Sequence, residues 1–165
     1  SASVRCWGEN SGGQLGAQTT ETCDIDHMTT CSTTPLVVDL DSDMDGCVNS
    51  REQGGNAALG GMRNTKQFWD FFDTPTNTGV RDRVISTGDL QRLVSRFGST
   101  QSPAPTFSAA LAQALGVPAA TGYNAAFDRA APSPGGDPWD LNAPDGSISA
   151  GDILFLINQF GHSCA

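Results

Sequence analysis

The sequence has few basic residues, few aromatic residues and no long apolar run. Only 9 Lys and Arg stand against 18 Asp and Glu, for a formal net charge of -9 at pH 7. This balance argues against nucleic acids or anionic membranes as partners, because both are themselves negatively charged. No run of about 18 apolar residues occurs, so no membrane-spanning helix is expected. The composition favours a cation as partner.

Motifs of several enzyme classes are also missing. The two histidines, His27 and His162, form no H-x-x-x-H or Cys-His arrangement, and no G-x-S-x-G nucleophile motif occurs. Carboxylates are abundant, but they alternate along the chain beside glycines. This spacing suits a metal cage better than the two opposed acids of a glycosidase. The sequence therefore predicts a protein that is not an enzyme.

The hydrophobic core is expected to be modest, because aromatics make up 7% of the chain while Gly and Pro number 19 and 9. Five cysteines and the acidic balance favour an extracellular protein, secreted or on a cell surface, with disulfides. Cys23 and Cys31 flank a short polar stretch and are the easiest pair to join. Cys47 and Cys164 are suited to joining the two ends of one module, which leaves Cys6 unassigned, and other pairings stay open. The absence of an initiating Met and of a leader suggests a processed segment.

The chain predicts a small α+β fold, with a Thr-rich β segment followed by a mainly helical region with long loops. Phe107, Leu111 and Leu115 fall at helical spacing between Pro105 and Gly116, which predicts one short helix. The expected divisions are a β segment at 1–40 and a second domain at 41–164, with units 41–62, 69–98 and 139–161 and a spacer at 99–138.

The second domain contains an internal duplication. Residues 82–98, DRVISTGDLQRLVSRFG, align without a gap with residues 145–161, DGSISAGDILFLINQFG. An aromatic-acid pair, Trp69-Asp70 or Trp139-Asp140, precedes each copy. Each copy predicts a helix with one apolar stripe, and we expect the two stripes to pack against each other. The stripes are Leu90, Leu93, Val94 and Phe97 in one copy, and Ile153, Leu156, Ile157 and Phe160 in the other.

The strongest motif is DSDMDGCVNSRE, residues 41–52, which matches the twelve-residue EF-hand calcium loop. Calcium takes six to eight hard oxygen ligands, and alternate residues of a tight loop can direct their oxygens inward. The alternative, an acidic turn in which Asn49 and Glu52 cap a helix, explains neither the three Asp nor Gly46. The expected ligands are Asp41, Asp43, Asp45, the carbonyl of Cys47, Asn49 and Glu52.

Two less regular loops are expected to bind calcium as well, for about two or three ions in total. Their serine-to-aspartate spacing equally fits a helix capping box, so that alternative stays open. Asp128 is expected to be a solvated or locally paired carboxylate, with a ligand role as the alternative. The expected ligands are Asp70, Asp73, Asp82, the carbonyl of Val84, Ser86 and Asp89 in the middle loop, and Asp140, Asn142, Asp145, the carbonyl of Ser147, Ser149 and Asp152 in the last.

Paired units of the form D-x-N-x-D-G-x-I-x-x-x-D followed by an apolar helix resemble dockerin domains, the duplicated calcium-binding modules of secreted bacterial proteins. The resemblance covers about residues 39–164. It implies calcium, folding coupled to metal binding, a bacterial origin and a cohesin-like receptor as partner. The chain departs from the pattern by insertions in the two later loops, by its long spacer and by the additional regular loop at 41–52.

The stretch RCWGENSGGQLG, Arg5 to Gly16, resembles one repeat of the regulator of chromosome condensation family, whose repeats build β-propellers. The likeness continues through the strand Leu36 to Leu40. One repeat cannot form a propeller, which needs several blades. An isolated two- or three-stranded piece leaves open edges, so other copies of the chain are the expected partner, by strand addition.

Three functions follow as hypotheses. The first is a non-enzymatic extracellular calcium-binding structural protein that assembles into a surface appendage or filament through its N-terminal β segment. The second is a dockerin-type docking module that attaches a larger secreted protein to a cohesin-like receptor. The third is a calcium-stabilised carbohydrate-binding module. We take the first as the primary hypothesis.

Overall fold

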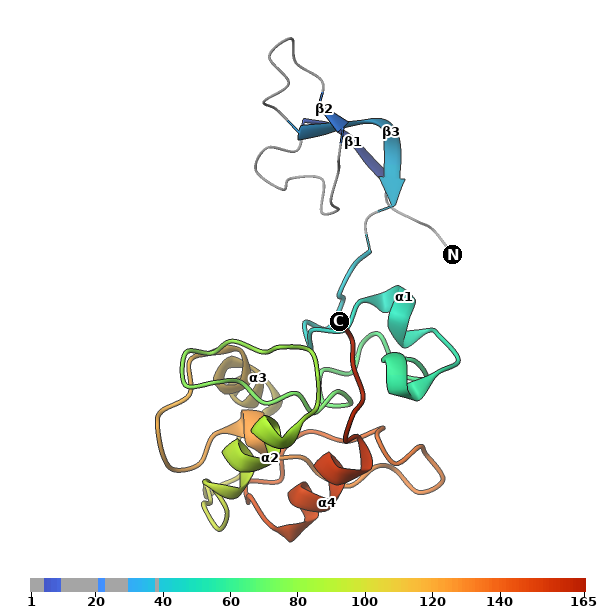
Figure 1. The fold of residues 1–165 in the computed structure, drawn as a ribbon. Coiled ribbons are helices and arrows are strands. Elements are labelled where there is room, and N and C mark those ends of the chain that lie inside the picture. Colours follow the sequence, from blue (N-terminus) through green and yellow to red (C-terminus); the bar gives the residue numbers. More distant parts are fainter. Residues whose placement is uncertain (1–4, 10–20, 23–29, 38) are drawn as a thin grey trace. The chain divides into compact units, whose positions relative to one another are not determined.

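The computed structural model describes residues 5–9, 21–22, 30–37 and 39–165 (Figure 1). The chain divides into two compact units, Ser1–Leu40 and Asp41–Ala165. Within the described residues, no helix combines the length and apolar character needed to cross a lipid bilayer.

The first unit contains a three-stranded antiparallel sheet in the order β1-β3-β2. Strand β3 (Thr30–Val37) is central, and β1 (Arg5–Glu9) and β2 (Glu21–Thr22) are the edges. The register between β1 and β3 shifts between Cys6 and Gly8, which marks a bulge. The predicted Cys23–Cys31 disulfide lies outside the described residues, as does the side chain of Cys6.

The second unit is mainly helical, with long connecting loops, so the sequence-based α+β description holds in outline. Its helices are short, and the side chains of Ser86, Thr106 and Ser149 cap the N-termini of the three longest. The elements are α1 (Asn49–Glu52), η1 (Ala57–Leu59), α2 (Thr87–Val94), α3 (Phe107–Leu115), η2 (Ala125–Phe127) and α4 (Ala150–Asn158).

The two duplicated segments hold each other by equivalent backbone hydrogen bonds. The carbonyl and N–H of Ile85 exchange two bonds with residues 161–162, which follow α4, at 2.8 and 2.9 Å. Ile148, the counterpart of Ile85, makes the same two bonds with residues 98–99, which follow α2, at 2.8 and 3.0 Å. Each loop therefore fixes the end of the other copy's helix, and the duplication in the sequence corresponds to an internal near-twofold arrangement.

Helices α2 and α4 pack against each other through only part of their apolar stripes. Leu93 and Leu156 have no exposed surface, and Leu90 and Ile153 are partly buried against the same core. The outer ends of the stripes differ from the expectation, and Phe97 and Phe160 lie beyond the last helical residues, Val94 and Asn158. Val94, Phe97, Ile157 and Phe160 remain about half exposed, at 50%, 56%, 49% and 49%.

The expected helix within the 99–138 segment is present as α3, with Thr106 as its N-cap. It buries its small residues, Ala110 and Ala114, and leaves the predicted stripe residues Phe107 and Leu115 largely exposed. Small side chains allow this helix to approach η2 closely. The segment is therefore part of the core rather than a spacer.

The core of the second unit includes a fully buried arginine. The guanidinium of Arg129 lies 4.9 Å from the ring centroid of Trp69 and 4.3 Å from that of Phe72. It donates hydrogen bonds to the carbonyls of Trp69, Ala125 and Asp128 at 3.0, 3.2 and 2.9 Å. Backbone oxygens and aromatic faces thus replace the water that this cation loses.

The predicted Cys47–Cys164 disulfide is confirmed. It joins residues 117 positions apart, so it ties the first acidic loop to the C-terminal end of the chain. Both cysteines are buried. A bond closing so long a loop limits the freedom of the unfolded chain and stabilises the folded unit.

Candidate metal centre

Three loops of the second unit share a hydrogen-bond pattern in which a leading carboxylate accepts from the N–H of a turn residue. The turn residues have positive φ, at 103°, 63° and 95° along the chain, a conformation that favours glycine. The middle loop nevertheless has an arginine there. The three pairs are Asp41 with Gly46, Asp73 with Arg83 and Asp128 with Gly146, at N···O distances of 3.0, 2.6 and 2.7 Å.

The acid just before each turn residue closes a second, smaller turn. Its side chain accepts from the N–H two residues further on, as Asp commonly does in tight turns. These pairs are Asp45 with Cys47, Asp82 with Val84 and Asp145 with Ser147, at 2.6, 3.0 and 2.9 Å. All three loops are therefore built on one local plan, although the chain between the two acids lengthens from the first loop to the last.

The first loop gathers acids, and several of their buried oxygens lack protein donors. Oxygens of Asp41, Asp43 and Asp45 lie within 4.8 Å of one another, and so do oxygens of Asp45, Glu52 and Asp70. Neither carboxylate oxygen of Glu52 accepts a hydrogen bond, and the residue has no exposed surface. In all, five buried carboxylate oxygens here have no hydrogen-bond partner: Asp43 Oδ2, Asp45 Oδ2, both oxygens of Glu52 and Asp70 Oδ1.

Such an arrangement is unfavourable without a cation, because buried acids lose water and repel one another. Burial, followed by the charges of Asp43, Asp70 and Asp41, raises the pKa of Glu52 to about 8. Burial and the charge of Asp43 also raise the pKa of Asp45 well above its usual value. A divalent cation would remove both penalties at once. The first loop can therefore hold a metal ion.

The structure places Asp70 in this first cluster, although the sequence analysis assigned it to the middle loop. Its carboxylate lies with those of Asp45 and Glu52. Asn49, by contrast, turns its side chain toward Ser42: Oδ1 accepts from the Ser42 N–H at 3.0 Å, and Nδ2 donates to Ser42 Oγ at 2.8 Å.

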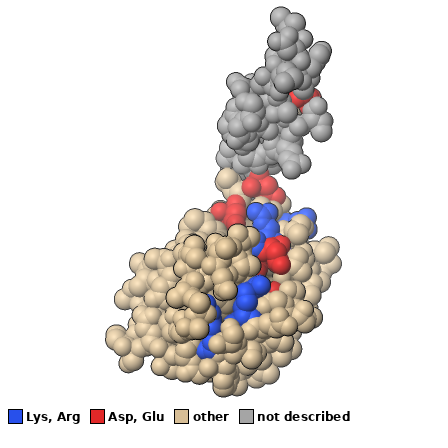
Figure 2. Space-filling view, turned by 60° about the vertical axis from the view of Figure 1, so that its left-hand side comes forward, with Lys and Arg blue, Asp and Glu red and all other residues tan. Residues whose placement is uncertain are grey.

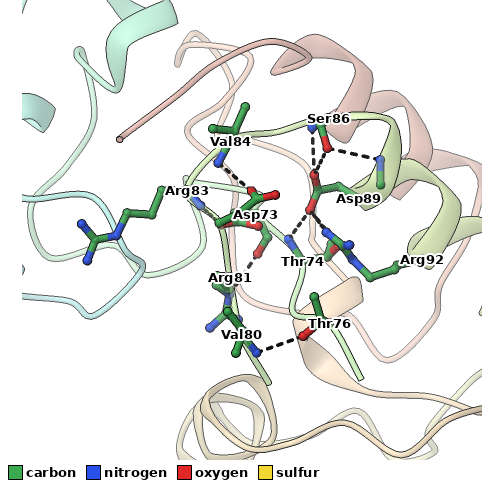
Figure 3. A network of polar contacts seen from close by, with 12 residues as sticks. Asp73, Thr74, Thr76, Val80, Arg81, Arg83, Val84, Ser86, Asp89 and Arg92 are labelled. Atoms are coloured by element: carbon green, nitrogen blue, oxygen red, sulfur yellow. Dashed lines mark hydrogen bonds and ion pairs between the residues drawn. The ribbon is translucent and has the colours of Figure 1, made fainter. Parts of the chain in front are cut away.

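The middle loop also gathers three acids, but protein donors already saturate one of them (Figure 3). Oxygens of Asp73, Asp82 and Asp89 lie within 4.8 Å of one another, and Asp82 is exposed. Asp89 accepts from Thr74, from Ser86 in the capping box that was the alternative to a calcium site, and from Arg92 in an ion pair of 2.7 Å.

These donors set the charge states of the middle cluster. Burial alone would raise the pKa of Asp89, but hydrogen bonds from Ser86 and Thr74 and the charge of Arg92 outweigh it and lower that pKa. The pKa of Asp73 rises to about 7, through burial and the charge of Asp89. Only Oδ1 of Asp73 is buried without a partner here. The middle loop can hold a cation, with fewer free ligand atoms than the first.

In the last loop, hydrogen-bond donors of the protein satisfy the buried carboxylates. Asp128 accepts from the Tyr123 hydroxyl at 2.8 Å in addition to the loop N–H groups. Asp152 accepts from the Arg129 N–H at 2.6 Å and from Ser149 in a capping box, which was the alternative to a calcium site here too. Among the described acids, no group of three in this loop has oxygens within 4.8 Å of one another.

Sequence reasoning missed Asp128 as the leading acid of the last loop and named Asp140 and Asn142 instead. Asp140 lies outside the acid groups found among the described residues, and Asn142 donates its amide to the carbonyl of Ala131 at 2.6 Å. A signal was present: the pair Phe127-Asp128 repeats the pair Phe72-Asp73, and both Phe side chains are buried. Long insertions after each pair hide this correspondence.

The backbone carbonyl ligands expected from sequence lie beside short inter-segment bridges. Val84 pairs with Ser163, and Ser147 pairs with Thr100, each in an isolated antiparallel bridge. On the face drawn in Figure 2, the charged side chains of the second unit form a band in which acidic and basic groups adjoin, and most of the remaining surface is uncharged.

No known family model, curated protein or solved structure matches the chain.

Proposed function

We propose that this chain is a non-enzymatic calcium-binding structural protein of the extracellular space, in which calcium completes the first loop of the second unit. The observation that supports this proposal is the set of five buried carboxylate oxygens without partners at Asp43, Asp45, Glu52 and Asp70. Natural proteins leave few buried polar atoms unpaired, so a cluster of them indicates an absent ligand.

Calcium is the ion that this set of ligands favours. The ligand atoms are all oxygens, which hard cations prefer, and neither thiolate nor imidazole lies in the cluster. The disulfide at Cys47 fits an oxidising, calcium-rich environment outside the cell. Calcium would act on stability rather than on a chemical reaction, because the ion would relieve repulsion among acids that the small core cannot offset.

The first unit is the proposed assembly element. Among its described residues, the sheet has three strands, with β1 and β2 as the edge strands. Strand β2 has two residues, and an open edge strand can accept a further strand from another chain. The proposal therefore assigns self-assembly to this sheet and rigidity to the calcium-loaded second unit.

A docking module is the second candidate, and the exposed ends of α2 and α4 favour it. Val94 and Ile157 lie in the last turns of the two helices, and Phe97 and Phe160 follow the helix ends. The two pairs are counterparts in the duplication, and all four residues are about half exposed. Apolar side chains gathered on adjacent helices often mark a binding surface. Two results would support this candidate. The chain would remain a monomer in calcium, and Phe97→Ser would abolish its binding to a receptor protein.

The test is calcium titration of the full chain by calorimetry after treatment with chelator. We expect a binding event that Glu52→Gln weakens by about a hundredfold, because it removes the closing carboxylate. Asp140→Asn is the matched control and leaves binding unchanged. Sedimentation with calcium and with chelator tests assembly: calcium should yield larger particles, and monomers in both conditions would refute the filament role.

A further inference from the structure

Asn49 holds the ninth position of the first loop, which in EF-hand loops often contacts the ion through a water molecule. Both polar atoms of its side chain are instead engaged with Ser42, at 3.0 and 2.8 Å. The loop itself therefore presents no side chain at that position.

Asp70 lies at the same cluster but comes from a different segment. It is 1% exposed, its Oδ2 accepts from the Asn64 N–H at 2.8 Å, and its Oδ1 has no partner. Oxygens of Asp70, Asp45 and Glu52 lie within 4.8 Å of one another. Two oxygens bound to one calcium ion at 2.3–2.6 Å can be at most about 5 Å apart. One ion can therefore contact all three residues.

The core holds Asp70 in place before any ion arrives. Its neighbours Trp69 and Phe71 are buried, and the side chain of Arg63 donates to its backbone carbonyl at 3.2 Å. A ligand fixed in this way loses little conformational freedom on binding, which strengthens a metal site.

We propose that Asp70 is a direct ligand of the ion in the first loop and takes the coordination position that a water molecule fills in a regular EF-hand loop. This inference rests on the proposed calcium site. One oxygen each from Asp41, Asp43, Asp45, the Cys47 carbonyl and Asp70, with both oxygens of Glu52, supplies about seven ligands, within the range that calcium accepts.

This ligand set is expected to make the site selective for calcium over magnesium. Magnesium loses its water reluctantly and requires octahedral geometry at shorter distances, so a site made wholly of protein oxygens favours calcium. The ion also links the loop to the Phe68–Phe72 segment of the core. Binding is therefore expected to stabilise that segment as well as the loop.

Terbium luminescence tests this assignment, because lifetimes in light and heavy water count the water molecules on the bound ion. At one equivalent of terbium, the lifetimes of the full chain give the reference number of coordinated water molecules. Asp70→Ala should add a coordinated water and weaken calcium binding by at least about tenfold, since a charged ligand is lost. Asn49→Ala, the matched control, should change neither the water count nor, beyond about threefold, the affinity.

The outcomes separate the two proposals. If Asn49→Ala adds the water and Asp70→Ala does not, Asp70 is no ligand, although the calcium site remains. If the unaltered chain binds neither ion, the proposed function itself fails. Should Asp70→Ala not fold, Asp70→Asn retains the shape and removes the charge; a loss of calcium affinity below about threefold in that variant would overturn the inference.

Discussion

Raising the pH should destabilise the second unit when calcium is removed. The pKa of Glu52 rises to about 8 and that of Asp73 to about 7, both through burial and then neighbouring carboxylates. Their ordinary values are 4.5 and 3.8. Between its ordinary and its raised value, each group binds a proton in the folded chain and releases it on unfolding. Stability therefore falls as pH rises through that window.

The magnitude follows from the same values. Each such group lowers the free energy of unfolding by about 1.4 kcal/mol per pH unit within its window. From pH 6.5 to 7.5 Glu52 contributes most of that amount and Asp73 part of it, for about 2 kcal/mol together. Burial also raises the pKa of Asp45 and of Asp70, so these groups add to the same fall and about 2 kcal/mol is the minimum loss. The pKa of His162 is lowered by burial, and its opposing effect ends near pH 6.5. A loss of about 2 kcal/mol corresponds to a fall of about 8 °C in melting temperature for a unit of this size.

Thermal unfolding followed by circular dichroism, in chelator and in calcium, measures this effect. In calcium the trend should reverse, because the ligands must lose their protons to bind the ion. In chelator, Glu52→Gln should reduce the dependence of the free energy of unfolding on pH by the contribution of about one proton. A melting temperature in chelator that stays constant or rises between pH 6.5 and 7.5 would refute the reasoning.

Three further predictions concern stability. Arg129→Met should lower the free energy of unfolding in denaturant by about 3 kcal/mol, because three buried carbonyls lose their donor; exposed Arg51→Met is the control, and equal effects would contradict the role of the buried cation. Replacing Cys47 and Cys164 with Ala should lower the free energy of unfolding by about 4 kcal/mol. An unchanged free energy would show that the disulfide is not what constrains the long loop. Asp128→Asn should destabilise the unit by about 1–2 kcal/mol without changing the number of calcium ions bound; a lost ion in calorimetry would make the last loop a metal site.

Features encoded by neighbouring residues were predictable from the sequence. Helices α2 and α4 begin at capping boxes whose serine and aspartate lie three residues apart, so local spacing suffices to place them. The duplication was readable because its copies align without gaps. The first acidic loop was readable for the same reason, since its acids are contiguous and its glycine marks the turn.

Features that depend on distant segments were not predictable. Asp70 joins the first cluster because packing of the core brings separate segments together. The burial of Arg129 likewise depends on two aromatic rings from another segment. Alternation and spacing describe one stretch of chain at a time, so they contain no information on such encounters.

The most direct test of the calcium site is a crystal structure of the full chain grown with millimolar calcium, with anomalous data to identify the ion. The account predicts one ion about 2.3–2.6 Å from oxygens of Asp43, Asp45, Glu52 and Asp70. A structure in which these carboxylates surround no ion, at a calcium concentration typical of the extracellular space, would contradict it.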